Sequence, residues 1–85
     1  MEVLFTRSAG RHGIARARAL YVLAHHVLAF DVGDGMTLYV GPDRGGIDLE
    51  VGTVPGHAGG TYVVHVMKLR SQFVAEYRSL APWDE

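Results

Sequence analysis

The sequence predicts an α+β fold in which two helices pack on an antiparallel sheet of about four to five strands. Two segments carry apolar residues at helical spacing, and between them β-prone runs alternate with glycine-containing turns. The composition, 48% apolar and 20% charged, is typical of a folded chain. At 85 residues the chain has room for one domain, 1–85, whose small core makes a covering partner plausible.

The first elements are a strand within residues 1–7 and a helix over residues 13–25. The polar, glycine-containing segment 7–10 ends the strand. The helix is predicted because apolar side chains recur at steps of three and four, and further apolar residues carry this surface nearly around it. The residues at helical spacing are Ile14, Ala17, Tyr21 and Ala24.

Residues 26–68 are predicted to form antiparallel strands. The turn Gly33-Asp34-Gly35 joins two β-prone runs into a hairpin, although continuation of the first helix to Phe30 is an alternative. A second turn at 41–46 precedes residues 47–52, which alternate apolar with acidic or small side chains and so place one apolar and one acidic face on a strand. After a loop at 55–60, residues 61–67 are β-branched on both faces, which favours the centre of the sheet.

A last helix is expected over residues 70–80, followed by a tail at 81–85. Ser71 can cap this helix, and Pro82 ends it. Apolar residues at Leu69, Phe73, Tyr77 and Leu80 form its core stripe.

The residues that are missing exclude several classes of protein. Without cysteine, the chain has no disulfide scaffold, no cysteine-ligated metal and no thiol nucleophile, and a cytoplasmic location fits best. No apolar stretch is long enough to cross a membrane. No histidine or carboxylate set shows metal-ligand spacing, so we expect neither a metal nor another cofactor.

The net charge of −1 conceals a basic first third, which has no acidic residue between Glu2 and Asp31. Arg11 and His12 come just before the predicted helix, where the positive end of the helix dipole favours an anion. Gly13 permits close approach of a phosphate. Arg11 and His12 are therefore candidates for binding RNA phosphate, whereas Arg16 and Arg18 fit a solvated helix face better.

Several short motifs resemble those of one toxin family. Arg11-His12-Gly13-Ile14 is similar to the Lys/Arg-His-Gly-Val/Ile segment of BrnT-like toxins. Leu38-Tyr39-Val40-Gly41, an acidic turn, Leu49-Glu50-Val51 and Val64-His65-Val66-Met67-Lys68, followed by Tyr77 on a helix, resemble the rest of that layout. The N-terminal Phe-x-Trp-Asp signature is missing, and Met67 replaces the strand arginine. The resemblance implies the RelE/ParE fold and a ribonuclease toxin that an antitoxin protein holds inactive.

RNA cleavage without a metal needs a base, an acid and cations that stabilise the phosphorane charge. Antiparallel pairing can bring His65 within a few ångströms of Glu50 as an acid–base pair, although a histidine on an interior strand is more often a packed residue with a satisfied ring. Lys68, Arg70 and Tyr77 could converge near the end of the sheet, where the resemblance places toxin residues.

These observations give one leading hypothesis and one alternative. The leading hypothesis is a metal-independent endoribonuclease toxin that binds RNA and an antitoxin. Its catalytic candidates are His65, Glu50, Lys68 and Tyr77, and its phosphate-binding candidates are Arg11, His12 and Arg70. The alternative is a non-catalytic interaction module of the same fold that binds a protein partner. The apolar first helix also allows a homo-oligomer.

Overall fold

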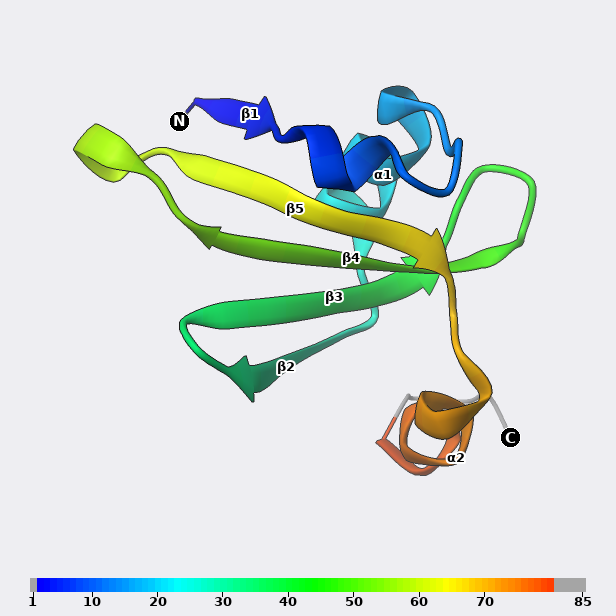
Figure 1. Cartoon of the computed structure of the whole chain (residues 1–85). Helices are drawn as coiled ribbons and strands as arrows, with labels where there is room; N and C mark the ends of the chain where they lie inside the picture. The colour runs from blue at the N-terminus through cyan, green and yellow to red at the C-terminus, as the bar shows by residue number, and fades with distance from the viewer. Residues whose placement is uncertain (1, 81–85) are drawn as a thin grey trace.

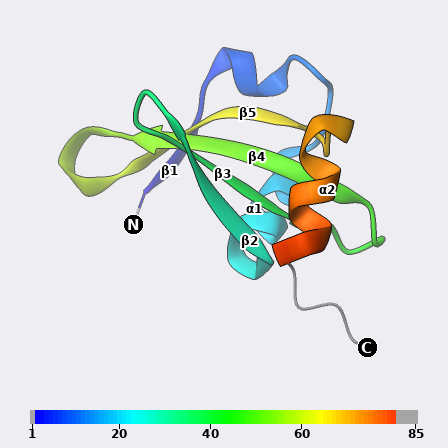
Figure 2. The same cartoon turned by 90° about the horizontal axis from the view of Figure 1, so that it is seen from below.

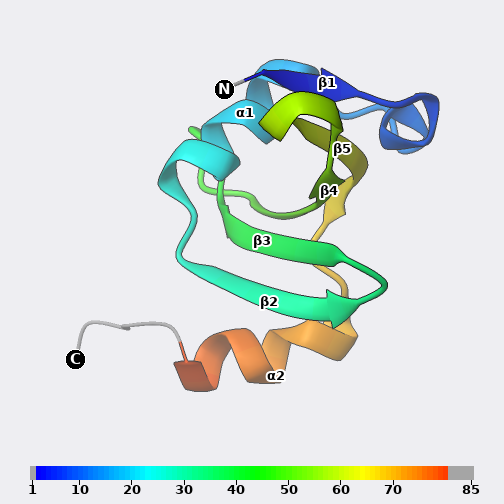
Figure 3. The ribbon, with the colours of Figure 1, turned by 90° about the vertical axis from the view of Figure 1, so that its left-hand side faces the viewer.

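The computed structural model describes residues 2–80 and shows a five-stranded sheet with one helix on each face (Figures 1 and 3). The predicted tail, residues 81–85, lies outside the described residues. The strands are β1 Val3–Phe5, β2 Leu28–Gly33, β3 Met36–Pro42, β4 Asp48–Pro55 and β5 Thr61–Lys68. The helices are α1 Arg16–His25 and α2 Ser71–Leu80, and two short 3-10 helices are η1 Arg7–Gly10 and η2 His57–Gly59. The predicted α+β architecture is confirmed.

The strands lie in the order β1-β5-β4-β3-β2, and all neighbours are antiparallel except β1 and β5. The first strand runs parallel to β5 and covers the outer edge of its first half, from Thr61 to Val63. It thereby supplies partners for backbone groups of β5 that would otherwise need water. The prediction of an antiparallel sheet is therefore wrong for this one pair of strands.

The first hairpin forms where the sequence predicts it. Asp34 and Gly35 connect β2 to β3, and both have positive φ, 54° and 77°. This is the backbone of the primed turns that match strand twist, and glycine and aspartate tolerate it. Continuation of α1 to Phe30 is wrong, because the helix ends at His25 and His26 is already extended.

The middle strand of the sheet is β4, not β5. Because β4 forms a hairpin with both β3 and β5, residues 49–53 are all buried. The strand β5 is interior but one place off centre, which is sufficient to explain its apolar residues on both faces. The predicted acidic face of β4 is also buried at Glu50, where hydrogen bonds from His65 and Arg70 compensate the buried charge.

The two faces of the sheet have separate cores. On the α1 face, Ala19 and Val22 of the helix pack against Leu49, Val51 and other strand residues. On the opposite face, which we call the α2 face, the helix α2 lies over the sheet (Figure 2). Here Leu38 and Val40 of β3 pack with Tyr77 of α2. The predicted stripe of α2 is confirmed at Leu69, Phe73 and Tyr77, which belong to this second core.

The helix α1 begins at Arg16, three residues later than predicted. Gly13 has a φ of +70° and Ala15 is extended, so neither continues a right-handed helix. Residues 10–13 instead form a turn in which the Gly13 amide donates to the Gly10 carbonyl over 3.1 Å. Arg11 and His12 therefore lie on this turn. Their predicted place directly before the helix is wrong, because residues 13–15 separate them from α1.

Candidate functional site

The site is built around Glu50, a carboxylate in the middle strand whose side chain is completely buried. Its register partner on β3 is Val40, so Glu50 lies on the α2 face. One carboxylate oxygen, Oε1, accepts hydrogen bonds from His65 Nε2 at 2.9 Å and from Arg70 Nη2 at 2.7 Å. The other, Oε2, accepts the backbone amide of Arg70 at 2.8 Å, and the Arg70 Nε atom lies 3.0 and 3.1 Å from the two oxygens.

These partners keep Glu50 ionised in spite of its burial. Burial by itself raises the pKa of this carboxyl, but the hydrogen bonds from His65 and Arg70 outweigh it and lower the pKa to about 2. The hydrogen bond to Glu50 in turn raises the pKa of Arg70. The acidic face that the alternation predicts is therefore an internal ion cluster, which we call the Glu50 cluster, made of Glu50, His65 and Arg70.

Because ionised Glu50 can only accept hydrogen bonds, the Nε2 atom of His65 must carry a proton. In the neutral imidazole, Nδ1 is then the lone-pair nitrogen, and it receives no hydrogen bond from any residue within 2–80. The side chain of His65 is 23% exposed. This ring can accept a proton at Nδ1 while Glu50 stabilises the imidazolium that results.

A β-bulge and a glycine shape the position of His65. The register between β4 and β5 changes between Gly52, which pairs with His65, and Thr53, which pairs with Val63. A bulge of this kind adds one residue and turns a side chain to a new direction. A Cβ on Gly52 would meet the Cβ of His65 at 3.1 Å and the sulfur of Met36 at 2.9 Å, so glycine provides the space.

The turn at 10–13 brings a second histidine to the cluster. The rings of His12 and His65 lie edge to face, with their centroids 6.2 Å apart and an interplanar angle of 83°. His12 is exposed, as is Arg11 beside it. The sequence placed His12 in a phosphate site of its own, but the structure puts it beside the predicted acid–base pair.

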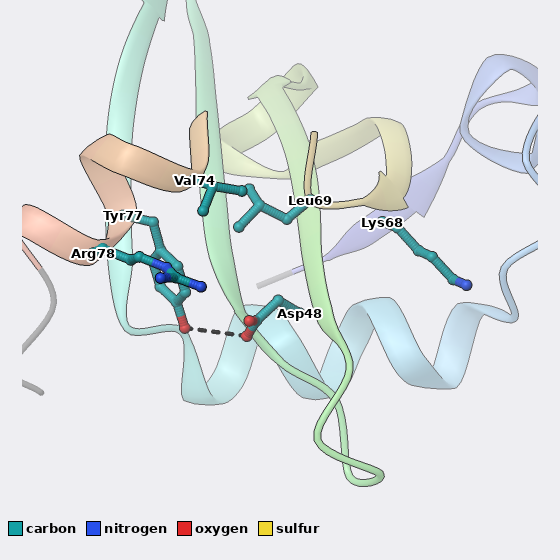
Figure 4. A pocket seen from close by; sticks show the side chains of 6 residues that line it. All are labelled: Asp48, Lys68, Leu69, Val74, Tyr77 and Arg78. Atoms are coloured by element: carbon teal, nitrogen blue, oxygen red, sulfur yellow. Dashed lines mark hydrogen bonds between the residues drawn. The ribbon is translucent and has the colours of Figure 1, made fainter. Parts of the chain in front are cut away.

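Lys68 and Tyr77 line a pocket of about 300 Å³ together with Asp48 (Figure 4). Arg70 does not line this pocket, and its guanidinium is hydrogen-bonded to Glu50. Tyr77 is 5% exposed and donates its hydroxyl to Asp48 Oδ1 at 3.1 Å. Burial and the Asp48 charge raise the pKa of Tyr77 to about 12. Lys68 is the register partner of Leu49, which faces α1, and its side chain extends away from Tyr77 (Figure 4).

Asp48 is the residue of this region that the sequence reasoning missed. The same alternation that placed Glu50 on an acidic face also contained Asp48, two positions earlier on β4. The strand pattern therefore indicated where Asp48 points, but it could not indicate that Tyr77 of the last helix would donate a hydrogen bond to it.

Within residues 2–80, no three histidine or carboxylate side chains gather closely enough to hold a metal ion. Over the same residues, neither helix is long and apolar enough to cross a membrane.

The sequence matches no protein-family model and no curated protein, but the fold matches a solved structure. This is the crystal structure of the Brucella abortus ribonuclease toxin BrnT, with a TM-score of 0.63 and 15% sequence identity. The match covers 84% of this chain and 99% of the toxin. The two chains thus share a fold, but their sequence identity is too low for site residues of the toxin to be assigned to this chain. The chain has the BrnT-like α+β fold that its short motifs predicted.

Proposed function

We propose that this chain is a cytoplasmic toxin that cleaves RNA without a metal and is held inactive by an antitoxin protein. The observation that carries the proposal is the 2.9 Å hydrogen bond between Glu50 and His65, which leaves Nδ1 of a half-buried imidazole available as a base. The BrnT-like fold supports the same function by analogy.

In this proposal His65 takes the proton of the ribose 2′-hydroxyl. Glu50 is too deeply buried to touch RNA, so it acts as a positioning residue that fixes the tautomer of His65 and stabilises its charged form. Arg70 is 39% exposed, and the remaining N–H groups of its guanidinium can donate to the phosphate. The cluster thus supplies a base and a cation within one hydrogen-bonded unit.

The other candidates take supporting roles. Lys68 is exposed at the end of β5, where it can contact the RNA backbone, and Arg11 can do so from the turn at 10–13. Tyr77 is a weaker proton donor than an ordinary tyrosine, because burial and the Asp48 charge raise its pKa to about 12. We therefore assign its hydroxyl to holding α2 against Asp48 rather than to proton transfer.

The antitoxin part of the proposal rests on apolar surface that the fold leaves open. Leu20 of α1 is 44% exposed, and Ala24 on the same helix is also exposed. Since residues four apart lie on one helix face, they form a small apolar strip that a protein partner can cover. A second copy of this chain is the other partner that such a strip allows.

The direct test is cleavage of single-stranded RNA by the purified chain in EDTA, with expression in bacteria as the cellular readout. We expect wild type to cleave RNA and stop growth. His65→Gln, which keeps a donor for Glu50, should lower cleavage on the order of a hundredfold or more. The matched control is His57→Gln, an exposed histidine in η2, which should cleave like wild type.

Three outcomes count against the proposal. Cleavage that EDTA abolishes and a divalent metal restores refutes the metal-free mechanism. Full cleavage by His65→Gln together with a lowered melting temperature makes His65 a packing residue. Harmless expression and no cleavage by wild type favour the interaction module, and pull-down with the product of the adjacent gene then identifies what it binds.

A further inference from the structure

We infer that His12 is the general acid that completes the proposed RNA cleavage, acting opposite His65; this inference rests on the proposed function. The observation is the pairing of two imidazoles from distant parts of the sequence, with ring centroids 6.2 Å apart. The ring of His65 is hydrogen-bonded to a buried carboxylate. The ring of His12 is exposed and makes no hydrogen bond to another residue within 2–80. Such different surroundings suit two different roles in proton transfer.

The turn that carries His12 is firmly attached to the strand that carries His65. The Thr6 amide donates to the Val63 carbonyl at 3.0 Å, and the Ser8 hydroxyl donates to the Val64 carbonyl at 2.9 Å. Ala9 of η1, which follows Ser8 in the chain, is buried in the core of the α1 face. Figure 1 shows η1 running beside β5. The backbone that leads to His12 is therefore held against the strand that carries His65.

The step balances in atoms and charge with these two residues alone. Neutral His65 takes the 2′-hydroxyl proton at Nδ1 while the 2′-oxygen forms a bond to phosphorus. The bond from phosphorus to the 5′-oxygen breaks, and protonated His12 gives its proton to that oxygen. The products are a 2′,3′-cyclic phosphate and a 5′-hydroxyl end, and no metal or redox partner takes part.

The surroundings assign the base to His65 and the acid to His12. Ionised Glu50 from β4 accepts the Nε2 proton of His65 and stabilises the charge that it gains on accepting a proton. Arg70, which follows β5, pairs with the same carboxylate, and Arg11 is the charged neighbour of His12 in the chain. His12 is exposed, so it can exchange its proton with water after each turnover.

The decisive experiment compares two linkages in a short single-stranded RNA, one natural and one in which sulfur replaces the bridging 5′-oxygen. A thiolate leaves without help from an acid. His12→Ala should therefore cleave the natural linkage on the order of a hundredfold more slowly than wild type, yet cleave the sulfur linkage at the wild-type rate. His65→Gln should be slow on both linkages. The bell-shaped pH profile of wild-type kcat/KM should lose its alkaline limb in His12→Ala.

His57→Ala serves as the control, because this exposed histidine belongs to η2 and not to the site. If wild type cleaves RNA and His12→Ala is fast on both linkages, or slow on both, the acid role is overturned while the proposed function stands. If wild type cleaves neither linkage, the proposed function falls and this inference falls with it. An unchanged melting temperature of His12→Ala excludes misfolding as the cause.

Discussion

Replacing Glu50 by glutamine tests how much the Glu50 cluster stabilises the fold. The substitution keeps the shape of a completely buried side chain but removes the charge that holds His65 and Arg70. It also removes a carboxyl whose pKa is lowered to about 2 by its partners in the cluster. The effect should therefore appear both as a loss of stability at neutral pH and as a changed response to acid.

The size of the effect follows from the pKa. A lowering of the pKa from 4.5 to about 2 corresponds to about 3 kcal/mol of unfolding free energy, at about 1.4 kcal/mol for each pKa unit. Because the folded-state pKa lies below the unfolded one, this stabilisation is complete above the unfolded value. It is lost as pH falls toward the folded value. Glu50→Gln should therefore lower the unfolding free energy by about 3 kcal/mol at pH 7. This is the lower end of the range for a broken buried ion pair, because Arg70 is 39% exposed and water can hydrate its charge in the variant.

Urea unfolding followed by circular dichroism at several pH values gives the free energies. Wild type should lose stability steadily below pH 5, and Glu50→Gln should start lower and change less over the same range. Asp34→Asn is the matched control, because this exposed turn residue has a φ of 54°, which asparagine also adopts. Equal stability of Glu50→Gln and wild type at pH 7, or identical slopes in acid, would refute the reasoning.

Two further substitutions probe the neighbourhood of the cluster. Gly52→Ala should cost about 1–3 kcal/mol in urea unfolding, because its Cβ would press on the Cβ of His65 at 3.1 Å and on Met36; an unchanged stability would mean that the bulge relaxes freely. Tyr77→Phe should cost about 1 kcal/mol because it removes the donor to Asp48. In wild type, absorbance at alkaline pH should show one tyrosine that ionises only near pH 12, and this late step should vanish in Tyr77→Phe.

The local pattern of the sequence determined the elements and the faces of the strands. The turn at Gly33-Asp34-Gly35 needs positive φ, which few residues other than glycine adopt, so the hairpin could be read directly. The adjacency of His65 and Glu50 was also predictable, because consecutive strands with a short connection pair antiparallel. The stripe of α2 followed from helical spacing alone.

Tertiary structure decided how distant parts of the chain meet. The parallel pairing of β1 with β5 brings the turn at 10–13 to His65, and no pattern near His12 encodes that partner. The bulge that orients His65 and the return of Arg70 to Glu50 depend on packing across strands and on the cost of an unpaired buried charge. These energies arise only when the sheet is assembled. For that reason the sequence by itself indicated a pair, and the fold made it a cluster with a second histidine.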